Sequence, residues 1–243
     1  MKKTLLILIL FFVCKIQSQT KFTQSNESKI KDILLTKNTF CCLNKKLDSL
    51  KFTFKDPINN FVNVNLNRDI DFNYQHKRIY ILFESNGYQI DLITKNDTIY
   101  FKSLKTEYSN IFTFRSQNEN KLKILISLRN KLYNSKKNIK NLSEEITRDV
   151  TYGMNCGEGM NFTEEGIEIN NLVEEENLGS LAIMLANYNC ERQSFAVLGF
   201  SLLKQKNVEI PEKYSLIIEY IIKRNSELQT CSGCLSGLIE KIY

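Results

Sequence analysis

The sequence predicts an α+β protein in which an N-terminal antiparallel β-meander precedes a small all-helical C-terminal domain. Two patterns support this prediction. Apolar residues alternate with polar ones over residues 50–115, and after residue 120 apolar residues recur every three or four positions. The 243 residues are 42% hydrophobic and 25% charged, which is enough apolar material for a sizeable core. With 9 Gly and 2 Pro, the composition excludes collagen-like, linker-rich and low-complexity proteins.

Residues 1–18 are predicted to be a secretory signal peptide. Lys2 and Lys3 precede an apolar run over residues 5–13, and the small polar Ser18 follows. The run is shorter than the roughly 20 residues of a membrane-spanning helix, and no later stretch reaches that length, so no transmembrane segment is expected. Cleavage after Ser18 would leave an exported protein, periplasmic or secreted. The alternative is lipidation of Cys14, which would anchor the protein as a lipoprotein.

Residues 19–118 are predicted to form the β-rich domain. Val62, Val64 and Leu66 share one face of an extended segment, and the alternation continues through Ile70, Phe72 and Tyr74. Further on, Asn86-Gly87 and Asn96-Asp97 each separate two alternating runs, as the central residues of tight hairpin turns do. The pattern therefore predicts about five to seven strands that end near residues 111–114, with a short helix over Ser28–Leu35 before them.

Residues 119–150 are predicted to form a basic helical connector. Leu125, Leu128 and Leu132 recur at helical spacing. The segment between residues 121 and 140 contains no acidic residue and seven cations, which are candidates for a basic surface: Lys121, Lys123, Arg129, Lys131, Lys136, Lys137 and Lys140. Such a run is either an ordinary solvated face or a surface for an acidic partner. It lacks the interleaved aromatic residues of a nucleic-acid platform, so no nucleic-acid partner is expected.

The charge divides the chain into two parts. Residues 19–150 hold 23 Lys and Arg against 14 Asp and Glu, whereas residues 151–243 hold 7 against 13. One interpretation is that each part has its own solvated surface. The other is a basic surface offered to an acidic macromolecule or a protein.

Residues 151–243 are predicted to form the helical domain. Thr163 can cap a helix whose first turn carries two acidic residues. Further helices are predicted over Leu178–Tyr188, over Glu191–Lys206, from Pro211 to Arg224, and from Cys231 to the end of the chain. The last of these rests on apolar residues at helical spacing: Leu235, Leu238, Ile239 and Ile242.

The segment LVEEENLGSLAIMLANYNCERQSFAVLGFSLLKQKN resembles a HEAT-type helical pair, in which two helices joined by a short turn stack in sequence. More widely, the signal peptide, the β-rich front, the YGMNC segment, the helical pair and the terminal TCSGC are similar to those of uncharacterised exported bacterial proteins. The resemblance implies macromolecular binding by a HEAT-like domain over residues 151–243. It carries over no active residues.

The cysteines are the only chemical motif. An even number of cysteines in an exported chain indicates disulfides, and Cys156, Cys190, Cys231 and Cys234 are the candidates in the helical part. At the start of a helix, the C-x-x-C of Cys231 and Cys234 would have a lowered thiol pKa, so thiol redox chemistry or zinc binding by this pair is the alternative. A single C-x-x-C without a second pair is a weak zinc motif.

No catalytic grouping is visible in the sequence. The chain has one histidine, which excludes sites that need two imidazoles, and His76 beside Lys77 and Arg78 is expected at the surface. No catalytic residue, metal or cofactor is therefore expected. The sequence predicts an exported, non-enzymatic protein that binds another macromolecule; an immunity or inhibitor protein fits the composition equally well.

Overall fold

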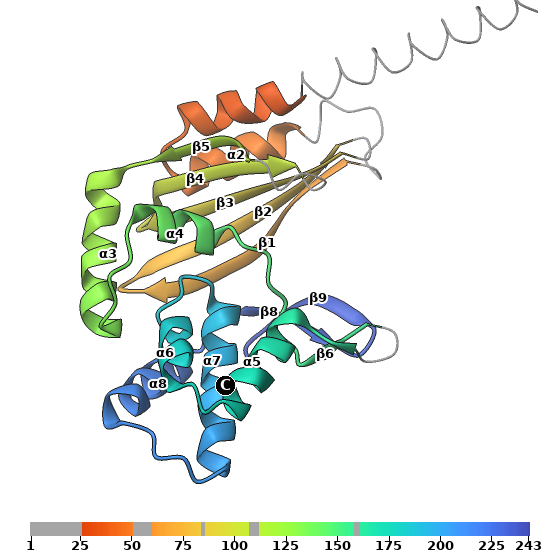
Figure 1. Cartoon of the computed structure of the whole chain (residues 1–243). Coiled ribbons are helices and arrows are strands. Elements are labelled where there is room, and N and C mark those ends of the chain that lie inside the picture. The colour runs from red at the N-terminus through yellow and green to blue at the C-terminus, as the bar shows by residue number, and fades with distance from the viewer. Residues whose placement is uncertain (1–25, 51–59, 84–85, 107–111, 158–160) are drawn as a thin grey trace, which may run out of the picture.

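The computed structural model describes residues 26–50, 60–83, 86–106, 112–157 and 161–243. It shows a five-stranded antiparallel sheet followed by a mainly helical part, which confirms the predicted α+β class (Figure 1). None of the helices in these ranges is long and apolar enough to cross a membrane.

The sheet is a meander in which each strand pairs with the next one along the chain. Its strands are β1 (Asn60–Asp71), β2 (Tyr74–Phe83), β3 (Asn86–Lys95), β4 (Thr98–Thr106) and β5 (Phe112–Gln117). The predicted turn at Asn96-Asp97 is confirmed, because both residues have positive φ, 49° and 68°, between the paired residues Lys95 and Thr98. Both residue types tolerate this conformation.

Two details of the predicted meander are wrong. Asn86 pairs with Phe83, so Asn86-Gly87 belongs to β3 and is not the turn. The strand predicted to continue through Phe72 is interrupted, because Phe72 and Asn73 form the two-residue turn between β1 and β2 with φ of 54° and 64°. Period-two alternation does not distinguish such a turn from a continuous strand, since the turn keeps the spacing of apolar residues.

Helices cover both faces of the sheet. On one face, residues 26–36 and α2 (Phe40–Leu50) pack against a core that includes Leu92. On the other face, α3 (Glu119–Tyr133) and α4 (Ile139–Ile146) pack against a core that includes Ile93 (Figure 1). The helix over residues 26–36 agrees with the predicted short helix. The sequence patterns did not predict α2, and the apolar residues 52 and 54, which they place in a strand, lie outside the described residues.

The C-terminal part is built around a buried helix. Its helices are α5 (Glu164–Glu174), α6 (Leu178–Leu185), α7 (Cys190–Gln205) and α8 (Glu212–Arg224). Thr163 caps α5 by accepting the Gly166 N–H at 3.0 Å, as its sequence position predicts. Helix α7 lies between α5, α6 and α8 and is buried along most of its length (Figure 1).

The last predicted helix is wrong. The chain ends in a hairpin of β8 (Leu228–Ser232) and β9 (Leu235–Glu240). Gly233 and Gly237 have positive φ, 59° and 79°, which is incompatible with an α-helix. A second, shorter hairpin joins β6 (Asn155–Cys156) and β7 (Asn161–Phe162). The C-terminal part is therefore mainly helical and not all-helical.

The sheet and the helical part share a core. Tyr188 and Leu228 from the helical part are buried together with Ile70 of β1 and Leu125 of α3. A second buried cluster includes Tyr133 of α3, Leu185 of α6 and Ile217 of α8, so α3 also packs with these two helices.

Candidate functional site

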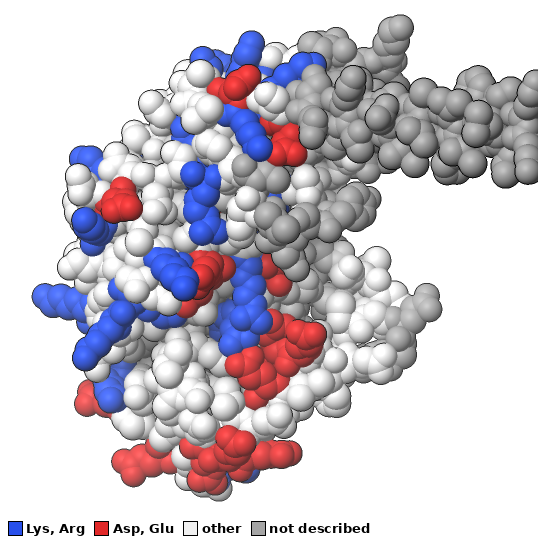
Figure 2. All heavy atoms as spheres, turned by 45° about the horizontal axis from the view of Figure 1, so that its top comes forward, with Lys and Arg blue, Asp and Glu red and all other residues white. Residues whose placement is uncertain are grey.

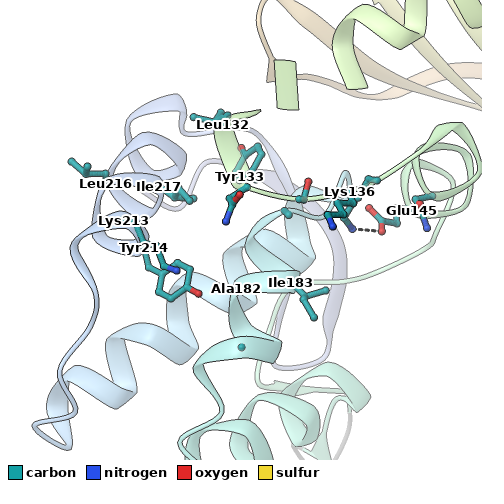
Figure 3. Close-up of a pocket in the computed structure, with 16 residues that line it drawn as sticks. Leu132, Tyr133, Lys136, Glu145, Ala182, Ile183, Lys213, Tyr214, Leu216 and Ile217 are labelled. Carbon is teal, nitrogen blue, oxygen red and sulfur yellow. Dashed lines mark hydrogen bonds and ion pairs between the residues drawn. The ribbon is translucent and has the colours of Figure 1, made fainter. Parts of the chain in front are cut away.

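A groove of about 920 Å³ lies between the end of α3, the turn that joins α3 to α4, and the helices α6 and α8 (Figure 3). Ile183 of α6 and Leu216 of α8 line it and are 68% and 59% exposed, although both side chains are large and apolar. Leu132, Ala182 and Tyr214 add further apolar lining. An apolar hollow of this size on a surface is typical of binding sites.

The rim of the groove carries two free positive charges. Lys136 projects from the turn between α3 and α4, and Lys213 lies in the first turn of α8 (Figure 3). Within the described ranges of the chain, neither lysine makes an ion pair. The ammonium of Lys213 lies 4.6 Å from the centroid of the Tyr214 ring. Both charges are therefore available to an acidic group that enters the groove.

The acid that lines the groove is already neutralised. Glu145 of α4 forms an ion pair with Lys137 and also accepts the Tyr188 N–H at 2.9 Å. Burial lowers the pKa of Lys137, and the adjacent Glu145 opposes that shift. With this pair balanced, Lys136 and Lys213 leave the groove positively charged.

The turn that presents Lys136 has a defined conformation. The side chain of Asn130 accepts the Lys137 N–H at 2.9 Å and donates to the Lys137 carbonyl at 2.8 Å. Asn134 ends α3 in the left-handed region, with φ of 49°, and Asn138 caps α4. Because these bonds fix the turn, Lys136 stands at the rim with little backbone freedom to lose on binding.

The prediction that Arg129 belongs to a basic surface is wrong. Its residue is 2% exposed, and it forms an ion pair with Asp71 of β1. It also donates to the Asn187 carbonyl at 2.7 Å, and its guanidinium lies 4.7 Å and 4.2 Å from the ring centroids of Tyr133 and Tyr188. Arg129 faces inward because helical spacing places it with the buried leucines of α3. It thereby holds α3 against the end of α6, and both helices border the groove.

The other predicted cations lie on the surface away from the groove lining. Lys121, Lys123 and Lys131 are exposed along α3, and exposed Lys140 lies 3.9 Å from Glu144. Of the seven predicted residues, Lys136 and Lys137 line the groove. Figure 2 shows Lys and Arg spread over the upper and middle part of one face, interspersed with some Asp and Glu, whereas acidic residues predominate at its lower end.

The predicted presence of a disulfide is confirmed. It joins Cys156 of β6 to Cys231 of β8, with the two Cα atoms 5.7 Å apart. The other two candidates are unpaired: Cys190 is buried and Cys234 is exposed. Cys231 lies in β8 and Cys234 lies in the turn that follows it, so the expectation of a thiol activated at a helix start is wrong. Across the described part of the chain, no group of three or more His, Cys, Asp or Glu could hold a metal ion.

The expected surface position of His76 is also wrong. His76 is fully buried in β2, with Nε2 2.9 Å from Asp91 Oδ1, and Arg68 Nε donates to its Nδ1 at 3.3 Å. Burial lowers the pKa of His76 to about 4, so the ring is neutral at pH 7. Arg68 in turn forms a buried ion pair with Glu191 of α7. Both ring nitrogens therefore belong to a network that ties the sheet to the helical part.

Sequence reasoning missed the two most exposed apolar residues of the groove. Helical periodicity identifies Leu181 and Leu185 as the core stripe of α6, and both are buried. Ile183 falls between them on the opposite face, and Leu216 likewise lies outside the stripe of α8. A large apolar residue outside the core stripe of a helix, as Ile183 and Leu216 are, is the sequence feature that could have indicated this surface.

No protein-family model, curated protein or solved structure matches the chain.

Proposed function

We propose that the chain is an exported, non-enzymatic protein that binds another protein through the groove between α3, α6 and α8. The observation that carries this proposal is the exposure of Ile183 and Leu216 in a hollow whose free charges, Lys136 and Lys213, are both positive. The partner would present apolar side chains flanked by acidic residues. Apolar burial would supply most of the affinity, and the lysines would steer and orient the partner.

Further features support the proposal. The sequence of α6 and α7 resembles a HEAT-type pair, and such helical pairs commonly present binding surfaces. The Cys156–Cys231 disulfide is typical of oxidising compartments, in agreement with the predicted signal peptide or, alternatively, with a lipoprotein anchored at Cys14. An immunity or inhibitor protein would use the groove in the same way, with a toxin or an enzyme as partner.

The thiol-based alternative has less support. Zinc binding or dithiol chemistry by Cys231 and Cys234 needs both thiols free, whereas Cys231 is bonded to Cys156. A protein-binding role does not require the Cys156–Cys231 disulfide to open.

The test is a quantitative capture of envelope and culture-fluid proteins by three forms of the protein. These are the native chain, the groove variant Ile183→Glu with Leu216→Glu, and the control Ile124→Glu. Ile124 is 53% exposed on α3 and does not line the groove, so the control makes the same type of substitution elsewhere, with one added negative charge instead of two.

The proposal predicts a protein that is retained by the native chain and by the control and is lost with the groove variant. If every captured protein is retained equally by all three forms, the groove is not the binding site. Circular dichroism of the three forms verifies that each is folded.

A further inference from the structure

The segment around the disulfide contains a third cysteine that the groove does not use. Cys156 and Cys231 are only partly buried, and Cys234 is exposed in the two-residue turn between β8 and β9. Because neither partner of the disulfide is buried, a nearby thiol can approach it. This arrangement places one free thiol three residues from one end of a disulfide.

Backbone hydrogen bonds hold the three cysteines in one corner of the fold. The Gly157 N–H donates to the Gly233 carbonyl at 2.9 Å, so the residue after Cys156 lies against the residue before Cys234. The Cys231 N–H donates to the Tyr152 carbonyl at 3.0 Å, which continues the same contact between the two segments. In Figure 1, β6, β8 and β9 lie together at one side of the helical part.

The sulfur of Cys231 lies toward the turn. Its Sγ is 3.5 Å from the carbonyl oxygen of Gly233, the residue that precedes Cys234. Gly233 has φ of 59°, and a Cβ built there would meet no atom within 4 Å. There is therefore open space beside Gly233, and the adjacent Cys234 is exposed.

We infer that Cys234 is an exchange thiol that transfers the disulfide from Cys156–Cys231 to Cys231–Cys234. The Cys234 thiolate attacks the Sγ of Cys231, the Cys231–Cys234 bond forms, and the Cys156–Cys231 bond breaks. Cys156 leaves as a thiolate and takes up the proton that Cys234 released. The number of thiols and disulfides is unchanged, so the step needs no oxidant or reductant.

The exchange changes how the helical part is closed. In the present linkage, the disulfide spans 75 residues and encloses α5 to α8 in one covalent loop. After exchange, the linkage is confined to the tip of the hairpin, and β6 is no longer covalently tied to β8. The two states therefore differ in the stability of the helical part and in which thiol, Cys234 or Cys156, is open to reagents.

The test uses the oxidised protein with Cys41→Ser and Cys42→Ser, which removes the exposed cysteines of α2. The protein is incubated at about pH 8 without added thiol, quenched with acid and alkylated, and its linkages are mapped by mass spectrometry. We expect the Cys231–Cys234 linkage to appear with alkylated Cys156, at a rate independent of protein concentration. Alkylation of Cys156 should be at least about tenfold greater than in the matched Cys234→Ser variant.

Two results would overturn the inference. One is a protein that retains only Cys156–Cys231, or whose only new linkage is Cys156–Cys234. The other comes from Cys156→Ser, which isolates the C-x-x-C pair. If Cys231 and Cys234 stay reduced in this variant under an oxidant that restores the native disulfide, the pair cannot hold the bond.

Discussion

Replacing Asp71 with Asn should destabilise the protein more than any surface change, because one buried carboxylate serves three side chains. Asp71 is fully buried and pairs with Arg129 of α3 and, at 2.7 Å, with Arg224 of α8. Tyr133 also donates to it, at 3.2 Å. Asp71 thus joins the sheet to α3 and α8, two of the helices that border the groove.

The size of the effect follows from what the substitution leaves behind. Asn has nearly the shape of Asp but no charge, so the guanidinium groups of Arg129 and Arg224, which are 2% and 8% exposed, lose their carboxylate. Removing one partner of a buried ion pair costs about 3–5 kcal/mol. The free energy of unfolding of a native protein is about 5–15 kcal/mol in total, so this loss is a large fraction of the stability.

The assay is urea unfolding followed by circular dichroism, with Asp69→Asn as the matched control. Asp69 lies on the same strand but is exposed, and its side chain accepts only a 3.3 Å bond from Gln75 among the described residues. The control should stay within about 0.5 kcal/mol of the native protein. If Asp71→Asn does not fold, Tyr133→Phe removes a single donor and should cost about 1 kcal/mol. A loss below about 1 kcal/mol for Asp71→Asn would show that the Asp71 carboxylate is not needed to hold the two buried arginines.

Three further predictions concern the disulfide, the buried histidine and the rim of the groove. Replacing Cys156 and Cys231 with Ser should lower the free energy of unfolding, measured in urea, by up to about 4.5 kcal/mol. This is the loop-entropy value for a disulfide that spans 75 residues. An unchanged midpoint of urea unfolding would contradict this prediction. The pKa of His76 is about 4 in the folded protein and 6.5 ordinarily, so between these values the unfolded chain binds more protons than the folded one. The free energy of unfolding should therefore fall by about 2 kcal/mol from pH 7 to pH 5, and His76→Gln should reduce this pH dependence. An equally steep pH dependence in the variant would show that another group causes it. Lys213→Glu should weaken partner binding about tenfold at low salt, measured by calorimetry, without loss of stability. Lys123→Glu, which lies outside the groove, should leave the binding constant nearly unchanged.

How far the sequence predicts the fold depends on where the decisive contacts lie. The turn at Asn96-Asp97 is predictable because two adjacent residues that tolerate positive φ separate two alternating runs. The C-terminal hairpin is not, because its apolar residues also fit a helix and only the positive φ of Gly233 and Gly237 excludes one. The spacing of apolar residues there predicts a helix, whereas the backbone conformation at the two glycines requires a hairpin.

The candidate site shows the same limit. Lys136 and Lys137 are recognisable as part of a basic run, and both line the groove. Arg129 belongs to the same run, yet it is buried because its counter-charge, Asp71, lies 58 residues away in the sequence. The groove itself forms only when α3 meets α6 and α8, and no single segment predicts that meeting.

Hydrogen–deuterium exchange of the protein, alone and with its captured partner, tests the binding groove most directly. If the groove binds the partner, exchange should slow on binding in peptides that cover residues 132–137, 179–186 and 213–217, the segments that form the groove. Protection confined to the hairpin of β8 and β9, or to the sheet, with these segments unchanged, would contradict it.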